Sequence, residues 1–272
     1  MQATTTQGGV EMETSNIIEV THLNKQFLVD KQPMEVLHDI SLQVKQGEFI
    51  TIVGHSGCGK STLLKIICGL VSYEDGQVER NGHPVTGPGP KCGMVFQDHR
   101  LLPWLKIKDN VGFGLGDLPK QERDEKVRKH LELVGLAGFE NSYPSQLSGG
   151  MSQRAAIARG LANNPTILLL DEPTNYLDEE HITWLKRYLQ DYENAFILIS
   201  HDIPFLNEVV NIIYHMENQE LNRYVGDYDH FQEVYAVKKA QLEAAYRRQQ
   251  QEIGELKDFV ARNKARVATR NM

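Results

Sequence analysis

Cysteine and long apolar runs are scarce in this sequence, and each scarcity excludes a class of protein. The three cysteines, Cys58, Cys68 and Cys92, are odd in number and lack metal-type spacing, which argues against a disulfide framework or a zinc site and favours reduced thiols. No apolar run approaches the roughly 20 residues that span a bilayer, and the first ten residues lack the apolar core of a signal peptide. We therefore expect a cytoplasmic protein with at most a peripheral membrane role.

The charge balance excludes general affinity for nucleic acid but is unevenly distributed. The 272 residues carry a net charge of −7, with 40% hydrophobic and 24% charged residues, which is ordinary for a soluble globular protein. From Lys238 to Met272, however, nine Lys or Arg stand against four Asp or Glu. The length allows one large domain, with or without an appendage.

The stretch from Phe49 to Leu70 carries the strongest chemical signal. An apolar run, Phe49 to Val53, predicts a buried strand, and the residues after Lys60 predict a helix. The glycine-rich turn between them satisfies the P-loop pattern, whose backbone N–H groups converge on phosphate. The expected phosphate-binding residues are Gly54, His55, Ser56, Gly57, Cys58, Gly59, Lys60, Ser61 and Thr62.

Two side chains of this loop have distinct expected roles. Lys60 supplies a positive charge to the β- and γ-phosphates, and Ser61 supplies a hydroxyl ligand to Mg²⁺. The helix that begins there turns its positive dipole end toward the nucleotide. A glycine-rich turn that binds nothing is the alternative, and the strand before and helix after the loop disfavour it.

A second buried strand, Thr166 to Leu170, ends in two adjacent carboxylates. Open α/β sheets place ligands at this end of their strands. We expect Asp171 to hold the Mg²⁺ shell and Glu172 to orient or polarise the attacking water. The alternative, a pair that merely caps a strand, is disfavoured by the P-loop upstream.

Two further strands deliver polar groups to the same expected edge of the sheet. The strand from Cys92 to Phe96 leads to Gln97, and the strand from Ala195 to Ile199 leads to His201. A lone histidine is usually structural, but its position after a predicted strand favours a contact with the γ-phosphate.

Residues 98–160 read as a helical insertion that ends in a second glycine-containing turn. Leu147 to Gly150 precede an alanine-rich helix, whose N-terminus can hold an anion. Taken alone, the turn is also compatible with a flexible linker.

Upstream of the P-loop, Phe27 lies in a predicted group of apolar, antiparallel strands. Its position is about equally compatible with stacking on adenine and with burial in the hydrophobic core.

In this order, the P-loop, Gln97, the LSGG turn, the LLLDEP strand end, Asp178 and His201 resemble the ATP-binding cassette (ABC) ATPase family over about residues 17–228. The resemblance implies an α/β fold of the P-loop NTPase class, an ABC-type nucleotide-binding domain with an antiparallel β subdomain and a helical insertion. It implies hydrolysis of ATP to ADP and phosphate, with Mg²⁺.

The resemblance also assigns residues to a dimeric site. In the family, two cassettes sandwich two ATP molecules head to tail. The resemblance implies that the γ-phosphate held by the partner's P-loop is bound by Ser148, Gly149 and Gly150 of this chain. It also implies that Asp178 lies in a loop that crosses between the two sites. Gln97 senses Mg²⁺ and water, and His201 holds the γ-phosphate.

The two halves of the chain resemble different branches of the family. From Gly47 to Asn164 the sequence is similar to those of the ATPase subunits of bacterial nitrate, sulfonate and taurine importers. There the segment after Gln97 meets the permease, so Leu101 to Trp104 would form a docking surface; an ordinary buried loop is the alternative. From about Leu170 onward, the sequence resembles the first cassette of ABC-F proteins, which act on the ribosome.

The C-terminal segment predicts a long basic helix. No proline occurs from Phe231 to Arg270, and a 4,3 spacing predicts a coiled-coil seam. In ABC-F proteins the basic linker reaches ribosomal RNA; a solvated helix face is the alternative. The seam residues are Leu242, Tyr246, Gln249, Ile253, Leu256 and Val260.

These patterns predict a disordered N-terminus (1–15), an ATPase domain (16–228, with a helical subdomain at about 98–160) and a helical extension (229–272). The first functional hypothesis is the ATPase subunit of a small-anion importer, paired with a second cassette and with transmembrane permease subunits. The second is a truncated or hybrid ABC-F factor whose partner is the ribosome. A hybrid with no native partner is a third.

Overall fold

The computed structural model describes residues 16–270, with side chains described as far as Val260. The chain divides into a unit that ends at Asp227 and a second unit that begins at Tyr228. The predicted disorder of residues 1–15 concerns a segment outside the described residues.

The first unit contains an antiparallel sheet with the strand order β2-β1-β4-β5. Its long hairpin turns at Asp30 and Lys31, both with positive φ, and pairs Phe27 with Met34. The apolar pieces around Ile17 and Phe27 belong to one bulged strand, and the expected loop after Gly82 contains a short strand. The strands are β1 (Asn16–Val29), β2 (Gln32–Lys45), β4 (Asp75–Arg80) and β5 (His83–Pro84).

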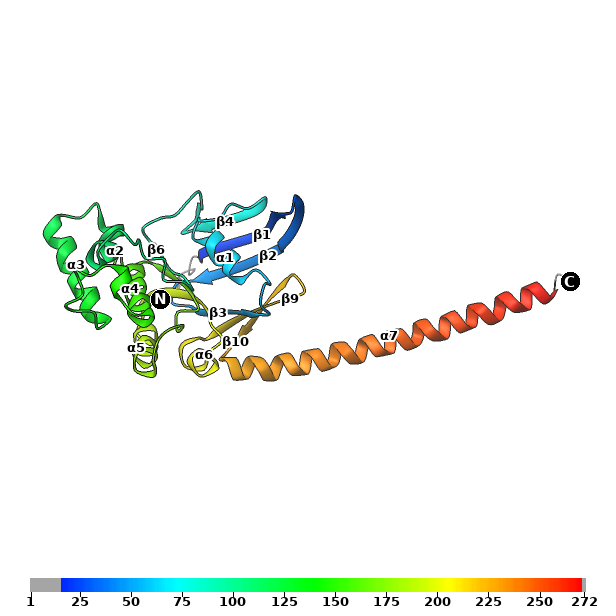
Figure 1. The fold of residues 1–272 in the computed structure, drawn as a ribbon. Coiled ribbons are helices and arrows are strands. Elements are labelled where there is room, and N and C mark those ends of the chain that lie inside the picture. The colour runs from blue at the N-terminus through cyan, green and yellow to red at the C-terminus, as the bar shows by residue number, and fades with distance from the viewer. Residues whose placement is uncertain (1–15, 271–272) are drawn as a thin grey trace, which may run out of the picture. The chain divides into compact units, whose positions relative to one another are not determined.

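The second sheet is the central one, with the order β10-β9-β3-β8-β7-β6. Its strands β3, β6, β9 and β10 are labelled in Figure 1. Neighbouring strands from β9 to β6 are parallel, and only the β10 edge is antiparallel. Each residue of β7 and β8 is buried, as expected for strands covered on both faces. The strands are β3 (Phe49–Gly54), β6 (Cys92–Val95), β7 (Ile167–Asp171), β8 (Ala195–Ile199), β9 (Ile212–Glu217) and β10 (Glu220–Val225).

The parallel strands explain why distant motifs meet. The carboxyl ends of β3, β6, β7 and β8 lie at one edge of the sheet, where the chain continues into the P-loop, Gln97, Glu172 and His201. Helix α1 (Lys60–Ile67) follows the P-loop. Its buried face packs with both sheets in one apolar core that includes Leu63, Ile52 and Val20.

The predicted helical insertion has an apolar core of its own. Buried residues such as Val111, Leu131 and Ala155 come from three of its helices and pack in a cluster whose buried members all lie in this insertion or directly after α4. The helix expected from Gln121 to Val134 is displaced by one residue. The helices are α2 (Ile107–Val111), η1 (Gly112–Leu115), α3 (Lys120–Leu133), η2 (Pro144–Gln146) and α4 (Gly149–Leu161).

The remaining helices are α5 (Glu179–Gln190), α6 (Ile203–Val209) and α7 (Tyr228–Arg270). The 43 residues of α7 form an uninterrupted helix, and Leu242, Tyr246 and Leu256 of the expected seam are each more than 60% exposed. A coiled-coil partner for this seam stays a prediction. Within residues 16–270, no helix has the length and apolar character needed to cross a bilayer.

Candidate active site

A cleft of about 630 Å³ opens at the carboxyl edge of the central sheet. It brings together most of the residues expected from the motifs. These are Phe27, Ser56, Gly57, Gly59, Lys60, Ser61, Thr62, Gln97, Asp171, Glu172 and His201. Four residues that the sequence reasoning missed also line it, Met34, Val36, Asn175 and Ile199. The pairing of Met34 with Phe27 across the hairpin was the available signal for Met34.

The P-loop leaves the N-terminus of α1 ready for an anion. Gly59 is the N-cap residue, its φ is 104°, and no side chain caps the helix. A Cβ at this position would lie 2.6 Å from Leu37 Cδ2, so both the backbone conformation and the close approach require glycine. The first N–H groups of the helix therefore have no side-chain acceptor and suit phosphate oxygens.

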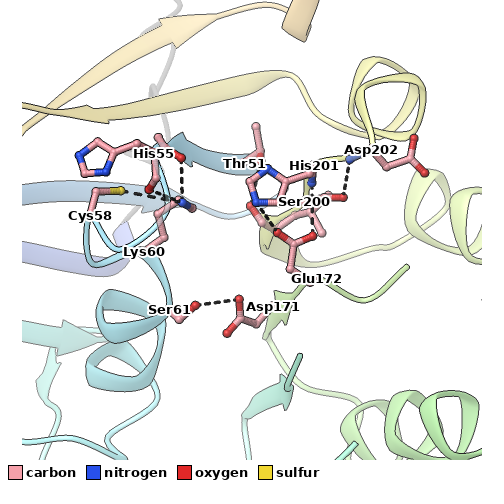
Figure 2. A network of polar contacts seen from close by, with 12 residues as sticks. Thr51, His55, Cys58, Lys60, Ser61, Asp171, Glu172, Ser200, His201 and Asp202 are labelled. Atoms are coloured by element: carbon pink, nitrogen blue, oxygen red, sulfur yellow. Dashed lines mark hydrogen bonds and ion pairs between the residues drawn. The ribbon is translucent and has the colours of Figure 1, made fainter. Parts of the chain in front are cut away.

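Lys60 is folded back over the loop that precedes it. Its Nζ donates to the carbonyl oxygens of Gly54, at 2.8 Å, and His55, at 3.0 Å, and only 8% of the residue is exposed (Figure 2). Both acceptors are neutral backbone carbonyls and not carboxylates, so they do not balance the charge of a lysine ammonium. The loop thus concentrates positive charge where phosphates would bind.

Asp171 and Ser61 form a pair of oxygen donors beside this charge. Ser61 Oγ donates to Asp171 Oδ1 at 3.0 Å, and Asp171 is 3% exposed. Burial raises the pKa of Asp171, while the Ser61 hydrogen bond opposes the rise. A hydroxyl and a buried carboxylate are the ligands that Mg²⁺ prefers, and a cation there would relieve the cost of the buried charge. The residues present therefore fit Mg²⁺.

Glu172 is held in an unusual backbone conformation. Its φ is 49°, in the left-handed region that glutamate rarely adopts, and its backbone N–H donates to Ile199 O at 2.8 Å. The end of β8 thus fixes the residue that follows β7. Strain of this kind persists only where the surroundings enforce it, which is typical of functional sites.

The Glu172 carboxylate is 3.1 Å from His201 Nε2 and accepts from the His201 backbone N–H at 3.3 Å (Figure 2). Burial is the largest influence on its pKa and raises it, whereas the His201 charge and hydrogen bond lower it. A carboxylate with a raised pKa is a better proton acceptor, which suits general-base chemistry.

Three other expected residues occupy the rim of the cleft. Gln97 is exposed at the end of β6, and 73% of the His201 side chain is exposed. Phe27 is 37% exposed, with Lys25 Nζ 4.8 Å from its ring centroid, so it lines the cleft and is not a core residue.

Seven expected residues, Gly54 among them, do not line the cleft. Ser148 caps α4 by accepting from the Met151 N–H at 3.3 Å, and Asp178 caps α5 by accepting from the His181 N–H at 3.0 Å. The cleft lining also lacks Gly149, Gly150, His55 and Cys58. Within the described residues, the LSGG turn and the P-loop therefore form separate parts of the surface.

Comparisons with known proteins agree with this geometry. A family model described as ABC transporter matches residues 37–175, and a second model with the same description matches residues 214–272. The uncharacterized ABC transporter ATP-binding protein YfmM of Bacillus subtilis (strain 168) is 47% identical, over 87% of this chain and 52% of that protein. The present chain thus spans about half the length of YfmM.

Two further relatives cover a more complete cassette. The aliphatic sulfonates import ATP-binding protein SsuB of the same Bacillus strain is 45% identical, over 68% of this chain and 74% of SsuB. A solved dimeric, post-hydrolysis structure of the ATP-binding cassette MJ0796, bound to ADP and Pi, is 31% identical with a TM-score of 0.69 and covers 76% of this chain and 98% of that one. The chain therefore belongs to the ABC transporter family, and it contains the fold of an ATP-binding cassette.

Proposed function

We propose that this chain is an ATPase that energises an ABC importer of a small anion, such as a sulfonate, nitrate or taurine. The observation that carries the proposal is the 45% identity with SsuB across three quarters of that protein. In this role the chain sits on the cytoplasmic face of the membrane, bound to permease subunits that cross it.

The segment from Leu101 to Trp104 is the proposed permease-docking surface. Trp104 is 70% exposed and Pro103 is exposed, whereas Leu101 and Leu102 are half-buried, and Leu101 packs against the core of the helical subdomain. An exposed tryptophan on a locally anchored segment is typical of an interface and is costly to leave in water. Asn110, which is fully buried, anchors the segment through hydrogen bonds to the backbone of Leu102 and Leu105.

At the active site, the chain's own groups divide the work of hydrolysis. Lys60 and the N-terminus of α1 bind the phosphates, and Ser61, Asp171 and Gln97 hold Mg²⁺, which neutralises charge on the phosphate oxygens. Glu172 accepts a proton from the attacking water, and His201 holds both the Glu172 carboxylate and the γ-phosphate. Phe27 stacks on the adenine base.

The site is completed by a second cassette. Ser148, Gly149 and Gly150 lie outside the cleft of their own chain, and an exposed helix N-terminus of this kind suits the γ-phosphate of a facing protomer. Asp178, exposed at the start of α5, then lies in the segment that crosses between the two sites.

Co-expression with candidate permease subunits tests the importer role. We expect the chain to co-purify with the permease, and Trp104→Ala to weaken that association at least about tenfold while basal ATP turnover stays within twofold. Leu28→Ala is the matched control, because Leu28 is equally apolar and 80% exposed but lies outside the docking segment. A chain that stays wholly soluble beside its permease would overturn the proposal.

A second candidate function rests on α7. The long exposed helix and the surplus of Lys and Arg after Lys238 suit binding to ribosomal RNA, as expected of an ABC-F factor. Sedimentation with ribosomes in ATP tests it, with Glu172→Gln used to retain ATP. Co-sedimentation that weakens steeply with salt would favour this candidate, and its absence at low salt would exclude it.

A further inference from the structure

We propose that His99 and Gln153 are positioning residues for ATP hydrolysis, because they join the segment after Gln97 to the backbone that carries Glu172. The inference rests on the proposed role of Glu172 as general base. Neither residue lines the nucleotide cleft, so both act through other groups.

Gln153 is the centre of this connection. It lies on α4 and is fully buried, and its Nε2 donates to Pro173 O at 3.3 Å. Its Oε1 is 3.0 Å from His99 Nδ1. Because the Pro173 carbonyl can only accept, the amide group must face it, and Oε1 is then left to accept from His99. His99 therefore carries a proton on Nδ1.

We call the hydrogen-bonded connection from His99 through Gln153 to Pro173 the relay, and both of its ends are held in place by other contacts. Arg159, also on α4, donates to Arg100 O at 2.7 Å and to His99 O at 3.0 Å, which ties the backbone after Gln97 to the helix. Pro173 directly follows Glu172, whose left-handed backbone is already strained. A displacement of the segment around His99 is thus transmitted through one buried amide to the peptide beside the base.

The same junction touches the LSGG turn. The Tyr176 ring lies edge-on to His99, with 5.0 Å between ring centroids, and Tyr176 has a φ of 67°. A Cβ at Gly150 would lie 2.6 Å from Tyr176 O, so only glycine allows this approach. The segment between Gln97 and the proposed docking surface, the LSGG turn and the segment after Glu172 therefore meet at His99, Gln153 and Tyr176.

If His99 and Gln153 only packed the structure together, the same contacts would be seen. Substitutions at His99 distinguish such a packing role from the proposed positioning role. His99→Leu removes the donor to Gln153, whereas the amide of His99→Asn can replace Nδ1–H. We expect His99→Leu to lower kcat about fivefold to tenfold, the size of one lost hydrogen bond, with ATP affinity within twofold. His99→Asn should recover most of the rate.

Gln153→Glu provides the second test, because a carboxylate can accept from His99 but cannot donate to Pro173 O. We expect kcat to fall at least as far as in His99→Leu. The melting temperature and nucleotide affinity of each purified full-length variant are measured alongside. If Gln153→Glu does not fold, the His99 pair still decides the question.

Three outcomes would overturn the relay: an unchanged kcat in His99→Leu, no recovery in His99→Asn, or a parallel loss of ATP affinity. Failure of the Glu172 assignment has a separate signature, since Glu172→Gln would then hydrolyse ATP at the wild-type rate. In the Glu172→Gln background, His99→Leu should cause no further loss, because the step that it positions is already absent.

Discussion

Two helix N-termini of this protein carry glycine-rich turns, and their surroundings differ sharply. The N-terminus of α1 has no side-chain cap and faces a cleft that holds Lys60, Asp171 and Glu172. The N-terminus of α4 is capped by Ser148 and lies outside that cleft. The first has the charged groups that chemistry on a phosphate requires, whereas the second offers only backbone N–H groups and one hydroxyl.

This difference indicates which turn takes part in the chemistry of hydrolysis and which one only binds phosphate. A phosphate bound at α1 would meet the proposed proton acceptor and Mg²⁺ ligands, so we propose that hydrolysis takes place there. A phosphate bound at α4 is held but has no nearby base among the residues of that turn. The proposed head-to-tail dimer combines the two, and the following experiments test each half separately.

The largest effect is expected at the α1 site from Glu172→Gln. Removing the proton acceptor should lower ATP turnover at least about 100-fold while ATP binding stays near wild type. Single-turnover hydrolysis and equilibrium binding of ATP measure the two quantities. Turnover at the wild-type rate would show that Glu172 is not the base.

The next effect is the loss of nucleotide binding in Lys60→Ala. This change removes the ammonium that lies against the Gly54 and His55 carbonyls and should weaken ATP binding roughly 30-fold or more. Titration with a fluorescent ATP analogue measures it. Lys65→Ala is the matched control, since Lys65 lies five residues later on the same helix and does not line the cleft.

At the α4 turn, Ser148→Asp should lower turnover about tenfold without destabilising the fold. Aspartate keeps the helix cap but places a negative charge against the partner's γ-phosphate. The neutral cap variant Ser148→Asn should retain activity. An equal loss in both variants would mean that the hydroxyl itself, and not the charge, matters.

Mixing the two defective proteins tests whether the turns act in trans. A dimer of one Lys60→Ala and one Ser148→Asp chain has one site with both an intact P-loop and an intact LSGG turn. The mixture should therefore hydrolyse ATP faster than either protein alone. Simple averaging of the two rates would argue that the turns do not meet across a dimer.

The smallest effect concerns stability and pH. Because the pKa of Glu172 is raised, the folded protein binds this proton more tightly than the unfolded chain, and the free energy of unfolding falls as pH rises above the ordinary glutamate range. Without nucleotide, Glu172→Gln should melt slightly higher than wild type at neutral pH, and the gain should shrink toward pH 5.

Glu74→Gln is the control of opposite sign. The Lys25 hydrogen bond lowers the pKa of Glu74, so its ionised form adds stability above the ordinary glutamate range. Its replacement should lower the melting temperature slightly at neutral pH, with a smaller loss in acid. Identical pH trends in the two variants would contradict the assignment of their pKa shifts.

Much of the fold could be predicted because local patterns and tertiary structure agree. The strand Ala195–Ile199 is found within its predicted bounds, and the strand after Thr166 is shifted by one residue. Both are fully apolar runs, the pattern of strands covered on both faces. The cleft residues followed from the rule that parallel strands present their carboxyl ends together.

Other features had no local signal. Met34 and Val36 line the cleft because the β1–β2 hairpin brings them beside Phe27. Gln153 and His99 lie 54 positions apart and are joined by one hydrogen bond. Nothing in their immediate neighbours distinguishes either one from an ordinary polar residue of a helix or a loop.

By itself the sequence determined the chemistry of this protein: glycines that allow phosphate to approach, a lysine and a hydroxyl beside them, and two carboxylates after a buried strand. The tertiary structure alone decided which groups act together. It brought Ser61 to Asp171 and His201 to Glu172, set the backbone of Glu172 in its strained conformation, and kept the LSGG turn out of the cleft. The reason is physical: residue type sets what a group can do, but distance and burial set its partners and its pKa.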